Sequence, residues 1–286
     1  MPPDLTSNGL AVPVDQEHFG PLRDSSSLRF DPEALRSRYR EDGYLYLRNV
    51  LDRDTVMEIR GAYFAAFTPG YLRGGTSPAE GIFSGQRPAR LPAHGVAGHP
   101  AHAFVRSARF ASFAADPRLE ALAATVLGGP VQRLPRAIVR HFDRSRPMAS
   151  RAHVDYSYLD HGSDQLVTLW IPLGDCPRPT GGLMYLEGSH RAERSTFDRL
   201  RTVTDRPGDT RAISHNLAWV ASQLGCRWLW ADYHAGDVTV HSPHIVHASL
   251  DTTTDVMRLS ADLRFLRQGE EADGRWLLAW AGDDGN

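Results

Sequence analysis

The stretch 236–251, GDVTVHSPHIVHASLD, places His241, His244 and His247 three residues apart within one short segment. The β-branched residues on both sides of Pro243 predict two short strands that bend at the proline, because proline cannot continue a helix. Side chains alternate between the two faces of a strand, so the three imidazoles cannot all face one pocket. At most one or two of these histidines can therefore bind a metal ion.

Outward from this stretch, the C-terminal half of the chain consists of short β-type segments separated by turn residues. The predicted strands in this half are residues 131–142, 165–172, 182–186, 237–241, 245–248 and 259–266. The elements predicted in the N-terminal half are helices at 32–42, 53–67 and 117–127 and a strand at 44–47. A partly helical insertion is expected at 191–224. Helices followed by many antiparallel-type strands predict an α+β fold, mainly a β core of the sandwich or barrel type.

Differences in composition along the chain predict its domain organisation. Residues 1–28 are polar and proline-dotted and are expected to form a flexible arm, whereas residues 29–286 form a single domain with its core at 130–267. Residues 68–103 are rich in glycine, proline and histidine and lack periodicity, which is typical of a binding loop or lid. The lid candidates, none with an assigned role, are Phe83, Arg87, His94, His99 and His102.

The overall composition excludes several classes of protein. With 41% hydrophobic residues, 23% charged residues and a net charge of -2, the chain has an ordinary globular composition and no basic field for nucleic acid or anionic lipid. The N-terminus lacks the regions of a signal peptide, and no apolar run reaches about 18 residues, so a cytoplasmic protein without a membrane span is expected. Cys176 and Cys226 are too few for a disulfide framework and are expected to be free thiols.

A second motif, H-x-D at residues 153–155, adds candidate metal ligands to those of the histidine-rich stretch. Residues two apart on a strand face the same side, so His153 and Asp155 can reach one ion. With a histidine from another strand they would form the two-histidine, one-carboxylate site of non-haem Fe(II) oxygenases, which leaves coordination positions open. Taken alone the motif is weak, because an isolated pair is usually a surface histidine and a turn aspartate.

Arg258 lies eleven positions after His247, and Ser260 follows it on the same face of a predicted strand. An arginine beside a hydroxyl suits the distal carboxylate of 2-oxoglutarate, because the planar guanidinium pairs with a carboxylate through two parallel hydrogen bonds. Arg264 is the next candidate for this contact. The spacing therefore adds a predicted co-substrate site to the predicted metal site.

With these motifs the chain resembles the phytanoyl-CoA dioxygenase family of Fe(II)/2-oxoglutarate-dependent oxygenases. The matching features are H-x-D at 153–155, WIPL at 170–173, GGLMYLEGSHR at 181–191, GDV at 236–238, His247 followed by Ala-Ser, and Arg258. The resemblance covers roughly residues 30–267 and implies a double-stranded β-helix, a cupin-like jelly roll with flanking N-terminal helices. It also implies that the H-x-D strand and the distal histidine come from opposing sheets.

The resemblance further implies a role for each candidate residue. The ligands of Fe(II) would be His153, Asp155 and His247. His244 would be structural or would contact a ligand residue without binding the metal, and His241 would either line the pocket or be a hydrogen-bonded core histidine. The residues expected to contact 2-oxoglutarate are Arg258, Ser260, Thr168, Trp170 and Arg140.

Some of these candidates have an ordinary structural alternative. Thr168 could satisfy a backbone group, and Trp170 could be a buried aromatic residue of a core strand. Tyr156 and Tyr158 are expected substrate contacts, as is His241, although aromatic residues beside a sheet usually pack against it.

These expectations together predict an oxygenase that uses Fe(II), 2-oxoglutarate and O2 to hydroxylate or oxidatively cyclise a small organic molecule. All 32 basic residues are arginine, which suggests a GC-rich bacterial genome and a secondary metabolite as substrate. Two alternatives stay open: a non-catalytic jelly-roll binding protein, and a cupin-like hydrolase or isomerase that uses the metal without 2-oxoglutarate. Asp155 argues against a halogenase, which needs that coordination position for a halide. Neither the substrate nor the oligomeric state follows from the sequence.

Overall fold

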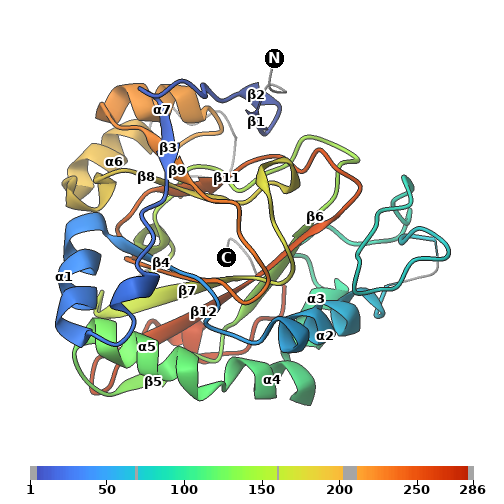
Figure 1. Cartoon of the computed structure of the whole chain (residues 1–286), viewed down its shortest axis with the longest axis horizontal. Coiled ribbons are helices and arrows are strands. Elements are labelled where there is room, and N and C mark those ends of the chain that lie inside the picture. The colour runs from blue at the N-terminus through green and yellow to red at the C-terminus, as the bar shows by residue number, and fades with distance from the viewer. Residues whose placement is uncertain (1–4, 68–69, 160, 202–210, 283–286) are drawn as a thin grey trace.

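The computed structural model describes residues 5–67, 70–159, 161–201 and 211–282, and two β-sheets with helices on their outer faces make up the fold (Figure 1). The larger sheet has the strand order β4–β10–β7–β12–β5, and β6 also pairs with β12. Its strands are β4 (Tyr44–Leu47), β5 (Val131–Arg133), β6 (Ile138–Phe142), β7 (Leu166–Pro172), β10 (Val238–His241) and β12 (Arg258–Arg267). Its pairings are antiparallel.

The smaller sheet has the strand order β11–β8–β9–β3. Its strands are β3 (Phe19–Pro21), β8 (Leu183–Leu186), β9 (Trp228–Trp230) and β11 (His247–Ser249). The pairs β11–β8 and β8–β9 are antiparallel, whereas β3 runs parallel to β9. A separate hairpin of β1 (Thr6–Ser7) and β2 (Leu10–Ala11) precedes β3 in the chain.

The two sheets pack face to face, as the layers of a double-stranded β-helix do. The core between them is largely aromatic and includes Tyr44, Tyr46, Trp170, Tyr185 and Leu229. Tyr44 on the larger sheet stacks on Tyr185 of the smaller sheet, with ring centroids 5.0 Å apart. The predicted jelly roll with an α+β, mainly β, architecture is confirmed.

Helices cover the outer faces of both sheets. Those in the described residues are α1 (Pro32–Asp42), α2 (Arg53–Phe64), α3 (Pro100–Val105), α4 (Ala108–Ala114), α5 (Pro117–Leu127), α6 (Arg194–Arg201) and α7 (Leu217–Leu224). Short 3-10 turns are η1 (Ser26–Leu28), η2 (Asp155–Tyr158), η3 (Arg178–Thr180), η4 (Ser189–Arg191) and η5 (Gly274–Leu277). Helices α1 and α5 lie beside the larger sheet, and α6 and α7 lie beside the smaller one (Figure 1). Within the part of the chain described, no helix has the length and apolar character that a membrane crossing requires.

Helices with clear capping residues begin and end where the sequence predicts. The Asp31 carboxylate accepts a hydrogen bond from the Ala34 amide at 3.0 Å, and Gly43 closes α1 with φ 76°, a conformation that favours glycine. Helix α5 also matches its prediction, whereas α2 ends three residues early. The strand predicted at 131–142 is divided into β5 and β6, because Pro135 between them has no N–H for the ladder.

The prediction of a flexible N-terminal arm is wrong for residues 5–28. The apolar side chains buried in this segment are Leu5, Val12, Phe19 and Leu22. Strand β3 also pairs with β9, which lies about two hundred residues later in the chain. The polar composition of the arm does not reveal this pairing, because the partner strand is so distant in sequence.

Asp251 fastens the N-terminal hairpin to the segment that follows β11. Its carboxylate accepts hydrogen bonds from Thr6 Oγ1 at 2.8 Å and from the backbone N–H groups of Asn8 and Gly9 at 2.9 Å each. Asp251 is only 5% exposed, so these donors replace water around a buried charge. The hairpin is thus tied to the same chain segment that carries His247.

Asp251→Ala is expected to lower the free energy of unfolding by about 2–3 kcal/mol, because three donors lose a charged acceptor. Asp251→Asn should cost less, since one carbonyl oxygen remains to accept. Urea denaturation of the three proteins measures the difference. Equal stability of the wild type and Asp251→Ala would show that the Asp251 carboxylate does not stabilise the fold.

Part of the predicted lid, 68–103, packs against β6. Tyr71 Oη lies 2.8 Å from Nε2 of His141 and donates to Oδ2 of Asp143 at 2.6 Å. The lid candidates with contacts in this region are Phe83, Arg87, His94, His99 and His102. These are contacts of a packed loop, and a lid function stays a prediction.

Candidate metal centre

Two histidines from neighbouring segments face each other beside the smaller sheet. His247 begins β11, and His153 pairs with it through two backbone N–H···O bonds of 3.1 and 2.9 Å. The centroids of the two imidazoles lie 4.1 Å apart. The expectation that the two histidines come from opposing sheets is therefore wrong, because the H-x-D segment pairs directly with β11.

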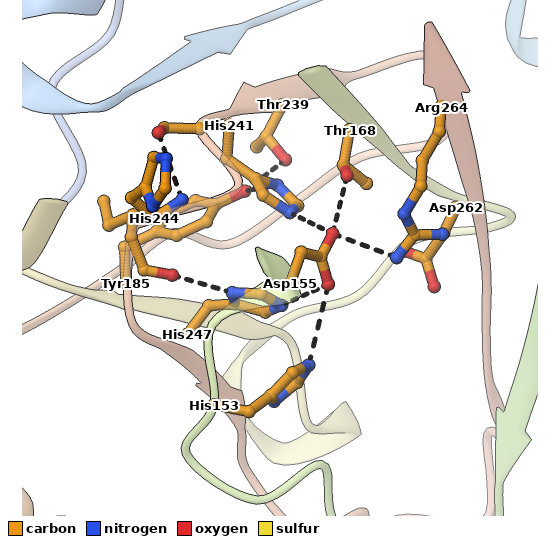
Figure 2. A network of polar contacts seen from close by, with 12 residues as sticks. His153, Asp155, Thr168, Tyr185, Thr239, His241, His244, His247, Asp262 and Arg264 are labelled. Carbon is orange, nitrogen blue, oxygen red and sulfur yellow. Dashed lines mark hydrogen bonds and ion pairs between the residues drawn. The ribbon is translucent and has the colours of Figure 1, made fainter. Parts of the chain in front are cut away.

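Asp155 reaches the histidines through a turn rather than along a strand. Val154 is extended, with φ -114° and ψ 139°, and Asp155 then begins η2. Its buried carboxylate lies between the two imidazoles and the side chains of the larger sheet (Figure 2). The predicted strand geometry of the H-x-D motif is wrong at this point, yet the two side chains still meet.

The three candidate ligand atoms lie close together without bonding one another. Oδ1 of Asp155 is 3.9 Å from Nε2 of His153 and 3.6 Å from Nε2 of His247, and both distances are too long for hydrogen bonds. One ligand atom from each residue lies within 4.8 Å of the other two. Two imidazole nitrogens and one carboxylate oxygen are the donor set of a facial metal site with open positions.

Backbone carbonyls determine which nitrogen of each imidazole carries the proton. Nδ1 of His153 lies 2.6 Å from the carbonyl oxygen of Arg151, and Nδ1 of His247 lies 3.0 Å from that of Ile245. A carbonyl oxygen only accepts, so each Nδ1 donates and each Nε2 keeps its lone pair. The lone pairs are therefore on the side of Asp155, as metal ligation requires.

Burial also sets the charges of the cluster. It lowers the pKa of His153 to about 4 and holds the pKa of His247 well below its ordinary value. Burial alone would raise the pKa of Asp155, but the positive charge of the Arg264 guanidinium holds that pKa well below its usual range. At neutral pH the cluster therefore consists of two neutral imidazoles and one carboxylate.

The second carboxylate oxygen of Asp155, Oδ2, is held by side chains of the larger sheet. Thr168 on β7 donates its hydroxyl to this oxygen at 2.6 Å, and Arg264 on β12 donates Nη2 at 2.9 Å. Nε2 of His241 on β10 lies 3.6 Å from the same oxygen. The hydroxyl proton of Thr168 is thus directed to Asp155, and not to the 2-oxoglutarate carboxylate that the sequence suggested.

A cavity between the two sheets adjoins this cluster. The residues that line it are Arg140, Ser150, His153, Asp155, Trp170, Leu183, His241, His247, Arg258, Ser260, Asp262 and Arg264. Four of these residues lie on β12, at every second position from Arg258 to Arg264, and so share one face of that strand. The cavity combines the three candidate metal ligands with four of the five residues predicted to contact 2-oxoglutarate.

Arg258 presents a buried positive charge to the cavity. The residue is only 2% exposed, and its guanidinium lies 4.6 Å from the ring centroid of Phe142. Nη1 donates to the carbonyl oxygen of Gly181 at 2.7 Å, and Nη2 lies 3.5 Å from Oγ of Ser260. Among the described residues its Nε has no hydrogen-bond partner. A buried guanidinium with an unused donor is suited to an anionic group that enters the cavity.

The other two histidines of the opening stretch differ in position. His241 lines the cavity, and its Nδ1 lies 2.9 Å from Tyr185 Oη, while its buried Nε2 has no hydrogen-bond partner in the described residues. His241 therefore both lines the cavity and is a hydrogen-bonded core histidine, which the sequence left as alternatives. The side chain of His244 is 37% exposed, and its Nε2 lies 2.9 Å from Oδ2 of Asp164, away from the cluster.

The remaining predicted site residues lie at the margin of the cluster. The ring of Tyr158 meets that of His153 edge to face at 5.5 Å, whereas the ring of Tyr156 lies 4.7 Å from that of His244. Nη1 of Arg140 forms an ion pair with Oδ2 of Asp262 at 3.1 Å. Neither tyrosine is among the described residues that line the cavity.

Sequence reasoning missed Asp262, Ser150 and Leu183 as cavity residues. Alternation along the strand could have indicated Asp262, which lies two positions after Ser260 on the same face. Ser150 and Leu183 carry no such signal, because their positions depend on how the two sheets approach each other.

A double-stranded β-helix with a buried His/Asp/His cluster beside an internal cavity defines the jelly-roll proteins with a two-histidine, one-carboxylate centre. A family model described as Phytanoyl-CoA dioxygenase (PhyH) matches residues 39–260. The chain belongs to the phytanoyl-CoA dioxygenase family. The matched region includes the three candidate ligands and Arg258.

Two characterised relatives are similar over most of their length. The chain is 26% identical to 1-deoxypentalenic acid 11-beta-hydroxylase of Streptomyces arenae over 273 residues, which are 92% of this chain and 90% of the relative. It is also 26% identical over 268 residues to the enzyme of the same name from Streptomyces exfoliatus, with 90% and 89% coverage.

Solved structures share the fold. The non-heme alpha ketoglutarate dependent carbocyclase SnoK from nogalamycin biosynthesis matches with a TM-score of 0.60 and 21% identity, over 88% of this chain and 89% of that one. The epimerase SnoN from the same biosynthesis matches with a TM-score of 0.59 and 23% identity, over 84% and 85%. At these identities the two structures support the fold alone.

Proposed function

We propose that this protein is an Fe(II)- and 2-oxoglutarate-dependent oxygenase that acts on a small organic molecule. The observation that carries the proposal is the convergence of two neutral Nε2 atoms and one carboxylate oxygen beside a cavity that also contains Arg258. A hydrolase or isomerase would need the metal ligands but not a buried arginine in the same cavity. The printed names of the Streptomyces relatives, which are hydroxylases, support the proposal.

In this proposal each part of the cavity has one task. His153 and His247 bind Fe(II) through Nε2, and Asp155 binds it through Oδ1, because these are the atoms left without hydrogen bonds. When bound, the iron would supply the oxidising power of the reaction, together with 2-oxoglutarate and O2. Arg258 pairs with the distal carboxylate of 2-oxoglutarate in place of water, since its guanidinium is buried beside Ser260.

The proposed substrate is a secondary metabolite, and the proposed outcome is hydroxylation or oxidative cyclisation. The characterised relatives are named for hydroxylation of 1-deoxypentalenic acid. These names support hydroxylation, and oxidative cyclisation is the second proposed outcome; the position of the substrate relative to the metal would select one of them.

The full chain, loaded with Fe(II) without oxygen and then given 2-oxoglutarate and O2, is expected to form succinate even without substrate. Chromatography of succinate together with an oxygen electrode measures the reaction, and Asp155→Ala is expected to give only the background of free Fe(II). Metal binding without succinate would favour the hydrolase or isomerase. A wild-type chain that binds no metal would favour a non-catalytic binding protein.

A further inference from the structure

The two oxygens of the Asp155 carboxylate have different surroundings. Oδ1 faces Nε2 of His153 and of His247 at 3.9 and 3.6 Å. Oδ2 instead accepts hydrogen bonds from Thr168 at 2.6 Å and from Arg264 at 2.9 Å (Figure 2). A carboxylate can bind a metal ion through one oxygen or through both. In this site two donors already occupy the second oxygen.

These donors are buried, which makes the contacts strong. Thr168 is 0% exposed, Arg264 5% and Asp155 6%. A hydrogen bond between two charged groups is stronger than a neutral one, and it gains further strength where water is excluded. Rotation of the carboxylate would break both bonds and leave the Arg264 charge buried without its partner.

Arg264 is itself held in place by the C-terminal segment. Its guanidinium lies 4.1 Å from the ring centroid of Trp276 in η5. Trp276 Nε1 lies 3.4 Å from the carbonyl oxygen of Tyr158, and Arg275 Nη2 donates to the same oxygen at 2.8 Å. Tyr158 ends η2, the turn that begins with Asp155. The turn η5 therefore contacts both the ligand segment and the arginine that holds the ligand.

We propose that Arg264 and Thr168 are positioning residues that hold Oδ2 of Asp155 and so leave only Oδ1 for the metal ion. A single-oxygen ligand keeps one more coordination position open than a chelating carboxylate would. This inference rests on the proposed metal site, but it assigns Arg264 a role different from that of Arg258. Arg258 directs its guanidinium to Gly181 and Ser260, whereas Arg264 acts on the metal through Asp155.

Co(II) is a suitable probe because its d–d absorption depends on coordination number and geometry. The full chain would be titrated with Co(II) in the absence of 2-oxoglutarate, as wild type and as Arg264→Met, Arg264→Lys and Thr168→Val. Arg267→Met serves as the matched control, since Arg267 ends the same strand but is exposed. Circular dichroism and thermal unfolding of the metal-free proteins establish that each variant is folded.

Arg264→Met is expected to bind Co(II) about ten- to a hundred-fold more weakly, with a changed d–d spectrum, because the carboxylate is free to rotate or chelate. Thr168→Val should change both properties in the same direction and by less. Arg264→Lys should recover part of the affinity, since an ammonium can donate to Oδ2 but cannot stack as a planar group on Trp276. Arg267→Met should match the wild type.

Wild-type Co(II) affinity and spectra in both Arg264→Met and Thr168→Val would overturn the inference. A second titration adds 2-oxoglutarate to the Co(II)-loaded proteins; if Arg264→Met changed only the affinity for 2-oxoglutarate, the inference would also be overturned, because Arg264 would then be a co-substrate residue. If Arg264→Met does not fold, Thr168→Val decides the question, because it removes one donor without leaving a buried charge unpaired. A wild-type chain that fails to bind Co(II) would instead refute the proposed metal site.

Discussion

His247→Ala is expected to abolish stable metal binding and all succinate formation, whereas His244→Ala is expected to retain about one metal ion per chain. Loss of His247 leaves one imidazole and one carboxylate, which cannot form a facial site. His244 lies three positions earlier, but its ring is partly exposed and its Nε2 contacts Asp164. The two substitutions remove the same side chain from the same segment, so each is the control for the other.

Metal content after desalting, measured by elemental analysis, tests this expectation. Both variants should show the wild-type circular dichroism spectrum, because neither substitution removes apolar core. If His244→Ala were the variant that lost metal, the assignment of His247 as a ligand would be wrong, and so would the register of the segment from β10 to β11. Retention of metal by His247→Ala would rule out the proposed ligand set.

Arg258→Ala is expected to weaken 2-oxoglutarate binding by roughly thirty-fold or more while metal content stays unchanged. The substitution leaves the distal carboxylate buried without a partner, and loss of such a pair costs on the order of 2–5 kcal/mol. Arg258→Lys should recover only part of the affinity, because an ammonium lacks the planar fork that matches a carboxylate.

Anaerobic titration of the Fe(II)-loaded protein with 2-oxoglutarate, followed by the charge-transfer absorbance, measures this affinity. Wild type, Arg258→Ala and Arg258→Lys would be compared at equal iron content. Unchanged curves in both variants would place the co-substrate contact elsewhere in the cavity and would reopen the hydrolase or isomerase alternative.

The part of the fold that the sequence predicted rests on local interactions. Helix α1 begins at the capping residue Asp31 and ends at Gly43 because these residues interact with backbone groups only a few positions away. Strand alternation likewise put Arg258 and Ser260 on one face of β12, and both line the cavity. The predictions were wrong where the interacting residues are distant in sequence. The pairing of β3 with β9, for example, cannot be predicted from the polar composition of the N-terminal arm.

The H-x-D motif, the third histidine and the spacing to Arg258 are visible in the sequence, and they were enough to predict which residues could form a metal site. How these residues meet depends on the folded chain, in which His153 pairs with β11 and Asp155 turns toward the larger sheet. The fold also brings Thr168 and Arg264 within hydrogen-bond distance of Oδ2 of Asp155. The two kinds of feature differ in how far apart along the chain the interacting residues lie. A cap or an alternating strand depends on neighbours along the chain, whereas the orientation of a buried carboxylate depends on donors that only the packing of two sheets brings within hydrogen-bond distance.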